Sequence, residues 1–167
     1  MPSEPLTTPS AWQRLWPWVL GLWLLDLAIK YWVSGQFIYA ERFNVLPIFD
    51  LTLVHNTGAA FSFLAGQGGW QRWFFSFVGL AVGVWLVRWL RQTPVSQRVL
   101  AYSLAALLAG ALGNLTERML NGYVVDYLLF YWPPYYFPAF NLADMLIFLG
   151  ASGMLVDMWL DAKGTSK

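Results

Sequence analysis

The sequence of 167 residues contains no cysteine and a single histidine, His55. The lack of cysteine excludes disulfides, thiolate nucleophiles and cysteine-ligated zinc. One histidine is also too few for a zinc site of the H-E-x-x-H type. Any chemistry that the protein performs must therefore use carboxylates, hydroxyls, amides, lysine or arginine, and we expect neither a metal nor another cofactor.

Charged residues are scarce as well. They make up 11% of the chain, whereas 58% of its residues are hydrophobic, and the mean hydropathy is +0.49. Roughly a quarter of the residues of an average soluble domain are charged. Such a composition favours a lipid environment, and the 11 tryptophans and 8 tyrosines suit the headgroup level of a bilayer. The net charge of +1 gives no indication of nucleic-acid binding.

Four apolar stretches are candidates for transmembrane helices, each of which needs about 20 residues, and they cover about 15–33, 73–90, 99–119 and 142–160. The first is interpreted as an uncleaved helix, because it contains Asp26 and Lys30 and no A-x-A-like cleavage site follows it. No internal repeat or low-complexity linker is visible. We therefore expect a single integral membrane domain over residues 1–167.

Lysine and arginine indicate the orientation of these helices. If four helices alternate, one side of the membrane receives Arg14, Arg88, Arg91, Arg98, Lys163 and Lys167. The positive-inside rule then places both termini in the cytoplasm. Residues 34–72 and 120–141 become outer loops. Strand-like residues at 36–44 and 49–54 predict a small sheet in the first, and Trp132–Pro138 reads as an interfacial aromatic segment in the second.

Ionisable groups inside a membrane span cost about 2.5–3.5 kcal/mol each, so they are candidate functional residues. Asp26 and Lys30 are four residues apart with the acid first, which is the favourable order for an ion pair on a helix. Asn114 and Arg118 share a helix face by the same spacing, and Arg118 either supports a site or extends to the headgroups. Glu117 is expected to face water. The polar groups of the spans thus gather toward the outer ends of the helices.

Asp126 and Asp144 are the strongest candidates for catalysis. Asp126 follows the apolar run G-Y-V-V, and Asp144 is the third residue of a helix for which Asn141 is the expected N-cap. Taken singly, Asp126 is equally consistent with an exposed loop acid and Asp144 with helix capping. Two carboxyl groups that share a site hold one proton between them, which suits general acid–base hydrolysis. Asn56 either hydrogen-bonds a substrate backbone or belongs to an ordinary turn.

Five motifs occur in order along the chain: D-L-A-I-K (Asp26–Lys30), N-T-G-A-A-F (Asn56–Phe61), G-N-L-T-E-R (Gly113–Arg118), V-V-D (Val124–Asp126) and F-N-L-A-D (Phe140–Asp144). Together they resemble the lipoprotein signal peptidases, type II, of bacteria. The resemblance runs from the first to the last predicted helix. The chain departs from the usual third motif, which has Ile and Asp where this sequence has Thr116 and Glu117.

The resemblance implies a fold, a reaction and a set of site residues. The fold is an all-α membrane protein with four transmembrane helices, a small outer β-cradle and a short interfacial helix between the third and fourth spans. The enzyme is an aspartic endopeptidase of the bacterial inner membrane that works at the outer leaflet without a metal. It removes signal peptides from diacylglyceryl-modified prolipoproteins, just before the lipidated cysteine. By position, the catalytic residues are Asp126 and Asp144, and the supporting residues are Asp26, Lys30, Asn56, Gly58, Asn114, Arg118 and Asn141.

The resemblance also implies partners: lipid-modified prolipoproteins, membrane lipid, and cyclic peptide antibiotics as inhibitors. We expect a monomer. Two other functions are compatible with the residues alone. One is a Ser/Lys peptidase that uses Lys30 with Ser34 or Ser62; the other is a proton-coupled membrane transporter that uses the same acids.

Overall fold

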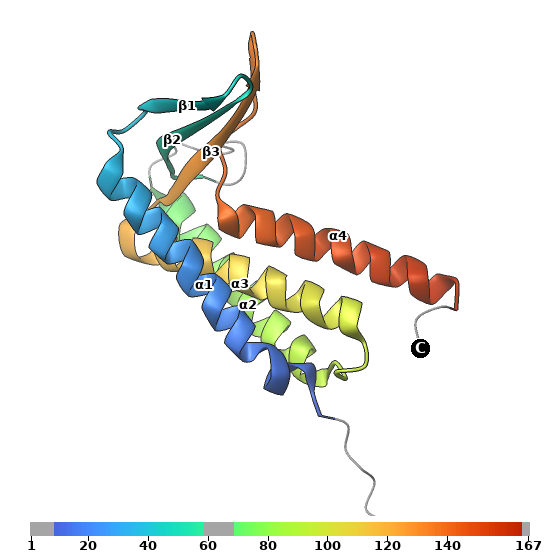
Figure 1. Cartoon of the computed structure of the whole chain (residues 1–167). Helices are drawn as coiled ribbons and strands as arrows, with labels where there is room; N and C mark the ends of the chain where they lie inside the picture. The colour runs from blue at the N-terminus through green and yellow to red at the C-terminus, as the bar shows by residue number, and fades with distance from the viewer. Residues whose placement is uncertain (1–8, 59–68, 165–167) are drawn as a thin grey trace, which may run out of the picture.

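The computed structural model describes residues 9–58 and 69–164, which form four long helices and a four-stranded antiparallel sheet (Figure 1). The sheet stands at one end of the helical bundle, next to the start of the last helix. The helices are α1 (Ala11–Gln36), α2 (Trp70–Gln92), α3 (Arg98–Asn121) and α4 (Leu142–Ala162). The strands are β1 (Arg42–Leu46), β2 (Phe49–Asn56), β3 (Val124–Trp132) and β4 (Tyr135–Tyr136), and they lie in this order across the sheet.

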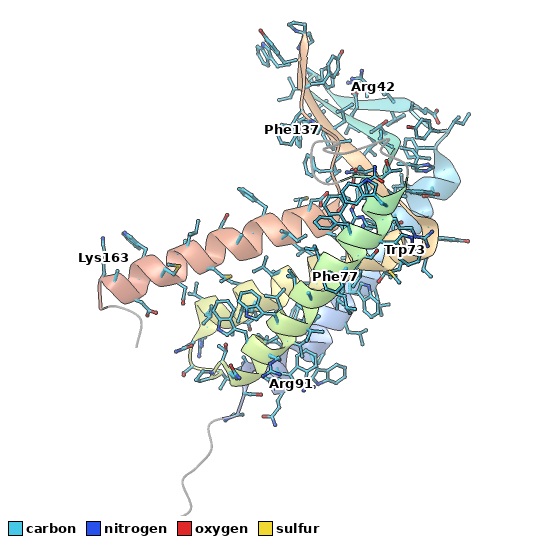
Figure 2. The ribbon with its side chains drawn as sticks, turned by 180° about the vertical axis from the view of Figure 1, so that it is seen from behind. Arg42, Trp73, Phe77, Arg91, Phe137 and Lys163 are labelled. Carbon is cyan, nitrogen blue, oxygen red and sulfur yellow. The ribbon has the colours of Figure 1, made fainter. Side chains whose placement is uncertain are left out.

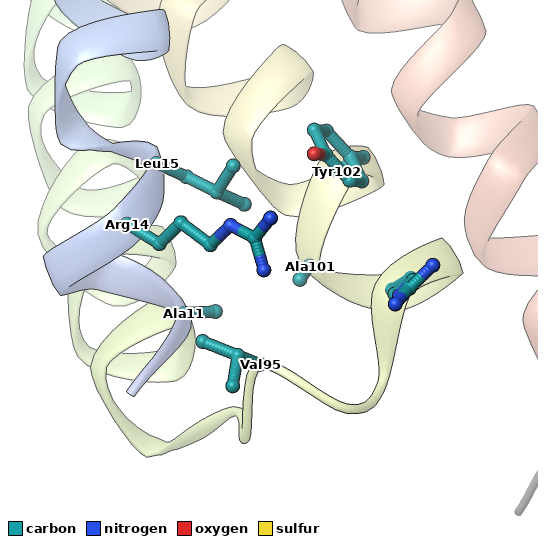
Figure 3. A pocket seen from close by; sticks show the side chains of 7 residues that line it. Ala11, Arg14, Leu15, Val95, Ala101 and Tyr102 are labelled. Carbon is teal, nitrogen blue, oxygen red and sulfur yellow. The ribbon is translucent and has the colours of Figure 1, made fainter. Parts of the chain in front are cut away.

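Each helix contains one of the four predicted spans and extends beyond it by a few residues. α3 packs against all three other helices. The apolar core between them lies in the half of the bundle away from the sheet, and includes Leu15, Leu86, Leu104 and Leu108. The start of α1 is held against the connection between α2 and α3, because the backbone N–H of Ala11 donates to the carbonyl of Thr93 at 2.8 Å (Figure 3).

Among the described residues, three helices are long and apolar enough to cross a membrane, namely α2, α3 and α4. Their outward faces carry large apolar side chains, such as Trp73 and Phe77 on α2 (Figure 2), which are 63% and 71% exposed. Contiguous apolar surface of this kind marks a region that contacts a partner or a membrane. α1, with 26 residues, is longer than these three helices, but it contains the charged residues Asp26 and Lys30 and is not among the three.

The small sheet was predicted, but its first strand begins later than expected. α1 continues to Gln36, and residues 38–41 then form a turn in which the N–H of Glu41 donates to the carbonyl of Ile38 at 2.9 Å. β1 therefore starts at Arg42. The second predicted strand, 49–54, lies within β2.

The prediction of a short interfacial helix between the last two membrane helices is wrong. That segment forms β3 and β4, and β3 pairs with β2 along most of its length. The local residues explain the difference. β3 is rich in β-branched and aromatic residues that favour strands, and Pro133 and Pro134 at its end are incompatible with a continuous helix. The chain therefore completes the sheet.

Close packing of α3 on α4 depends on glycine. A Cβ atom added to Gly150 would lie 2.7 Å from the carbonyl oxygen of Ser103 and 2.9 Å from the backbone nitrogen of Leu107. Because these are backbone atoms of the facing helix, they have little freedom to move. Gly150→Ala is expected to destabilise the protein by about 1–3 kcal/mol. Gly21→Ala, at a position with no atom within 4 Å, is the matched control and is expected to leave the melting temperature in detergent unchanged or higher.

Candidate active site

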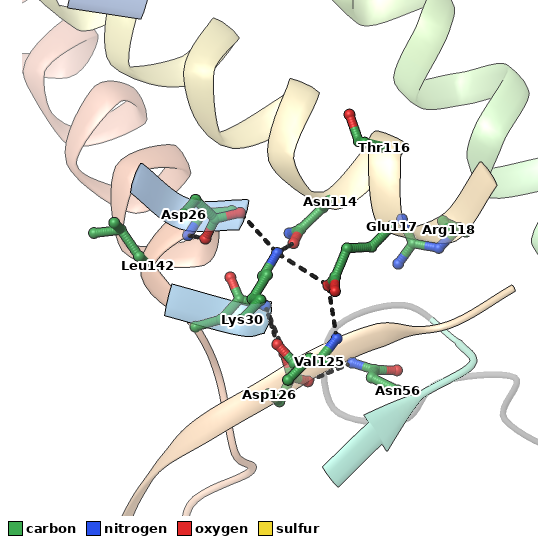
Figure 4. Close-up of polar contacts among 12 residues, drawn as sticks. Asp26, Lys30, Asn56, Asn114, Thr116, Glu117, Arg118, Val125, Asp126 and Leu142 are labelled. Carbon is green, nitrogen blue, oxygen red and sulfur yellow. Dashed lines mark hydrogen bonds and ion pairs between the residues drawn. The ribbon is translucent and has the colours of Figure 1, made fainter. Parts of the chain in front are cut away.

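The polar residues predicted from separate parts of the sequence meet where the sheet joins the helical bundle (Figure 4). Asp126 comes from β3 and Asp144 from the first turn of α4. α1 supplies two further charged residues, Asp26 and Lys30, and α3 supplies Asn114 and Glu117. Hydrogen bonds and ion pairs join these side chains into one network.

Asp126 is buried, with 2% of its surface exposed. Its two carboxylate oxygens accept hydrogen bonds from two side-chain amides: Nδ2 of Asn141 at 2.6 Å and Nδ2 of Asn56 at 2.9 Å. Burial, reinforced by the neighbouring charge of Asp144, raises the pKa of Asp126 from 3.8 to about 7. A carboxyl group in this environment keeps a proton close to neutral pH.

Asn141 joins the two acids. Its side chain donates to Asp126 and caps α4, accepting from the backbone N–H of Asp144 at 3.0 Å. The carboxylate of Asp144 in turn accepts from the backbone N–H of Asn141 at 3.2 Å. This is the capping box expected from F-N-L-A-D, and the N-cap prediction is confirmed. The capping interaction and the pairing of the acids therefore occur together, so the two interpretations of Asp144 are not exclusive.

A second layer of charges lies behind the two acids. The ammonium of Lys30 is buried and contacts Asp26 at 2.8 Å and Glu117 at 3.4 Å. It also donates to Oδ1 of Asn114 at 2.9 Å, while Nδ2 of Asn114 donates to Asp144 at 2.8 Å. The predicted ion pair of Asp26 and Lys30 is confirmed. Because an ammonium can only donate, it fixes the orientation of the Asn114 amide, and this orientation presents a donor to Asp144.

The carboxylates of this second layer also hold the backbone beside each acid. Oδ1 of Asp26 accepts from the N–H of Ala143 at 2.9 Å, next to Asp144. Oε2 of Glu117 accepts from the N–H of Val125 at 2.8 Å, next to Asp126. Both N–H groups are buried. The network of Lys30 thus sets the positions of the chain segments that carry Asp126 and Asp144.

Glu117 was expected to face water, and this expectation is wrong. Only 6% of its surface is exposed, and its carboxylate is shared between Lys30 and the backbone of β3. The sequence contained a usable signal, because Glu117 follows Asn114 by three residues and so lies on the same face of α3. Thr116, the other departure from the usual motif, accepts a hydrogen bond from the indole of Trp23 at 3.1 Å.

Arg118 and Gly58 lie at the edge of the site. The guanidinium of Arg118 donates to the carbonyl of Gly58 at 3.2 Å, and the N–H of Gly58 donates to Oδ1 of Asn56 at 3.0 Å. Arg118 is close enough to both acids to interact with them electrostatically. Its Nε has no hydrogen-bond partner among the described residues. Residues 59–61 of the same motif lie outside the described residues.

The other residues considered from the sequence have different surroundings. His55 stacks on Tyr123 with 4.0 Å between ring centroids, consistent with a structural role. Ser34 is exposed, whereas the amine of Lys30, its proposed base, is held by Asp26, Glu117 and Asn114. Ser62 lies outside the described residues.

An apolar groove leads to Asp144. It has a volume of about 750 Å³ and runs between the end of the β3–β4 hairpin and the outer face of α4. Its walls include Phe137, Phe140, Met145 and Phe148. Asp144 is the one charged residue among the described residues that line it. An extended apolar chain lying in this groove would reach the acid pair.

An apolar helical bundle with buried carboxyl groups gathered under a small sheet defines an integral membrane protein with a polar reaction centre. Comparison with known proteins identifies the family. The sequence model described as "Signal peptidase (SPase) II" matches residues 18–160. The chain therefore belongs to the signal peptidase II family, whose members are aspartic-type membrane peptidases.

Individual relatives agree with this assignment. The chain is 47% identical over 143 residues to the lipoprotein signal peptidase of Alteromonas mediterranea, covering 85% of this chain and 79% of that protein. It is 46% identical over 163 residues to the lipoprotein signal peptidase of Shewanella pealeana, covering 95% and 96%. A solved bacterial membrane enzyme superposes with a TM-score of 0.79 at 26% identity, covering 89% of both chains. Membership of a peptidase family decides against the transporter.

The raised pKa of Asp126 predicts how the stability of the protein depends on pH. Because the folded state binds this proton more tightly than the unfolded state, the stability that Asp126 contributes is complete below pH 3.8 and is lost as the pH rises through about 7. The melting temperature of wild type in detergent is therefore expected to fall over this range, and that of Asp126→Asn to fall less. Asp161→Asn, at an exposed position on α4, is the control and should follow wild type. Parallel curves for wild type and Asp126→Asn would contradict the raised pKa.

Proposed function

We propose that Asp126 and Asp144 are the catalytic pair of a membrane-embedded endopeptidase. One observation carries the proposal: two carboxyl groups are joined through Asn141 at the end of an apolar groove. A buried acid with a pKa of about 7 is suited to hold a proton at the pH of the reaction, whereas an acid at its usual pKa is not.

The pair supports hydrolysis by general acid–base catalysis. Near neutral pH the two carboxyl groups hold one proton between them. The ionised carboxylate removes a proton from a water molecule as its oxygen attacks the carbonyl carbon of the scissile peptide. The protonated carboxyl group gives its proton to the carbonyl oxygen. Collapse of the tetrahedral intermediate breaks the C–N bond: the departing nitrogen takes up a proton from the pair, and one hydroxyl of the intermediate returns a proton to the pair.

The substrate is proposed to be a diacylglyceryl-modified prolipoprotein, cut just before its lipidated cysteine. The relatives are named lipoprotein signal peptidases, and the groove at Asp144 is apolar along most of its length. Such a groove suits the apolar residues of a signal peptide or the acyl chains of a lipidated substrate. Cyclic peptide antibiotics are expected to compete with the substrate for the same groove.

The supporting residues divide into two groups. Asp26, Lys30, Asn114 and Asn141 orient the acids through the contacts described above. Asn56, Gly58 and Arg118 lie at the open edge, where Nε of Arg118 has no hydrogen-bond partner among the described residues and Asn56 already holds one oxygen of Asp126. We assign these three residues to binding the substrate backbone beside the scissile bond.

The chain is proposed to form one domain that crosses the bacterial cytoplasmic membrane four times, with α1 as the additional span. The charged residues within α1 face inward: Asp26 and Lys30 are 0% and 1% exposed and neutralise each other. Its lipid-facing residues, such as Trp18 and Leu24, are apolar. Arg91 and Lys163 lie at the helix ends away from the sheet (Figure 2), which favours cytoplasmic termini and an active site at the outer leaflet. We propose that the protein acts as a monomer.

Substitution of either acid tests the proposal. Purified wild type, Asp126→Asn and Asp144→Asn are incubated in detergent micelles with a diacylglyceryl-modified prolipoprotein and a metal chelator. Wild type is expected to release the signal peptide, and each variant is expected to lose activity by about a hundredfold or more, because a positioned acid or base contributes about that much. Asp161→Asn, which removes an exposed carboxylate, is the matched control and should cleave at the wild-type rate.

Two outcomes would overturn different parts of the proposal. If either Asn variant is folded and cleaves like wild type, the pair is wrongly assigned. If folded wild type cleaves an unlipidated precursor as readily as the lipidated one, the pair stands but the lipid is not part of what the enzyme recognises.

A further inference from the structure

A second pocket lies at the end of the helices away from the acid pair (Figure 3). It has a volume of about 140 Å³ and is lined by residues of α1, of α3 and of the connection that precedes α3. Arg98, in its wall, precedes Asn114 on α3 by sixteen residues, which corresponds to about 24 Å along the helix. The pocket is therefore separate from the active site.

The walls of this pocket are firmly packed. Ala11 and Ala101, which line it, are 0% and 2% exposed, and both belong to the apolar core. A backbone hydrogen bond from Ala11 to Thr93 and a β-bridge between Ser10 and Pro94 hold the start of α1 to the connection before α3. The pocket is thus a fixed part of the fold, made by segments far apart in the sequence.

Two positively charged residues, Arg14 and Arg98, line the pocket. The side chain of Arg14 extends from α1 toward α3, and its guanidinium lies beside Ala101 (Figure 3). Arg98 lines the same cavity. In the described part of the chain, neither arginine forms an ion pair with an acid, and the first turns of α1 and α3 contain no acidic residue. Both arginines are exposed, so their positive charges are open to an anion that enters the cavity.

The chemistry of the lining selects the anion. Guanidinium groups match the oxygen geometry of a phosphate, and they donate two parallel hydrogen bonds to it. Tyr102, also in the lining, has a hydroxyl that can donate a third. The volume exceeds the roughly 10–15 Å³ that one water needs by a wide margin, so a group of several heavy atoms fits. We propose that this pocket binds the phosphate group of an anionic phospholipid from the membrane leaflet opposite to the active site.

The surroundings of the pocket indicate that the bound phosphate group belongs to a lipid headgroup and is not free phosphate. The pocket lies at the ends of membrane-crossing helices, where headgroups are found. Trp18 follows Arg14 by one helical turn and is 61% exposed, and Tyr102 follows Arg98 by one turn and is 51% exposed. Aromatic side chains of this kind gather between headgroups and acyl chains. A lipid whose phosphate occupies the pocket would run its acyl chains past them.

Native mass spectrometry of the full-length protein in detergent tests the site. The protein is titrated with dioleoylphosphatidylglycerol and, in parallel, with dioleoylphosphatidylcholine, whose choline cation the arginines would repel. Wild type is expected to bind the anionic lipid more tightly. Arg14→Gln and Arg98→Gln are each expected to weaken its binding by roughly tenfold or more, as for loss of a hydrogen bond to a charged group. Arg88→Gln, which removes an exposed charge at the same end outside the pocket, is the control and should bind like wild type.

A further variant and a second ligand distinguish the pocket from a general effect of positive charge. Val95→Phe fills the edge of the pocket and keeps both arginines, so it is expected to weaken binding as well. The three arginines are exposed and Val95 is half-buried, so all variants are expected to unfold near the wild-type temperature. An equal loss in Arg88→Gln, or no loss in Arg14→Gln and Arg98→Gln, would overturn the site. If wild type binds inorganic phosphate but does not bind the anionic lipid more tightly than the zwitterionic one, the pocket is a site for free phosphate and the assignment to lipid is overturned.

Discussion

The buried ammonium of Lys30 is the contact on which the arrangement of the active site depends. It lies between the carboxylates of Asp26 and Glu117 and fixes the amide of Asn114. Each of these partners then makes one contact that positions Asp144 or the backbone beside Asp126 or Asp144. Without the ammonium, two carboxylates would be buried without a cation, an arrangement that costs several kcal/mol when one partner of a buried pair is removed. One charge thus ties α1 and α3 to the start of α4 and to β3.

The same requirement explains small residues nearby. A Cβ atom on Gly113 would collide with the carboxylate of Asp26, so glycine at this point of α3 lets α1 bring its acid into the network. Farther along, Gly110 and Gly150 let α3 and α4 approach each other closely. Glycines thus allow both the close packing of α3 on α4 and the charge pairing between α1 and α3. The apolar half packs the helices together, and the polar half holds Asp126 and Asp144 in place.

Several of these features could be predicted from the sequence. Four apolar stretches predicted the four helices. The spacing of Asp26 and Lys30 predicted their ion pair, and F-N-L-A-D predicted the capping box of Asn141 and Asp144. These predictions succeeded because each depends on residues close together in the chain. The contacts of Asn114 with Asp144 and of Glu117 with Val125 join residues of different elements, and periodicity alone does not specify them. The prediction of an interfacial helix was wrong. It rested on the family resemblance alone, whereas the residues of β3 and the two prolines that follow favour a strand.

The surroundings of Asp126 also explain its raised pKa. Burial favours the protonated form of Asp126, while amides on both of its oxygens favour the ionised form, and the balance leaves its pKa at about 7. The central claim is that the pair works with one proton shared between its members. The most direct test is the rate of cleavage of one lipidated substrate by wild-type enzyme as the pH is varied at constant ionic strength. The rate is expected to fall as the pH rises through about 7, because the pair then loses the proton that the carbonyl oxygen must receive. A rate that stays constant or keeps rising well into the alkaline range would contradict a shared proton.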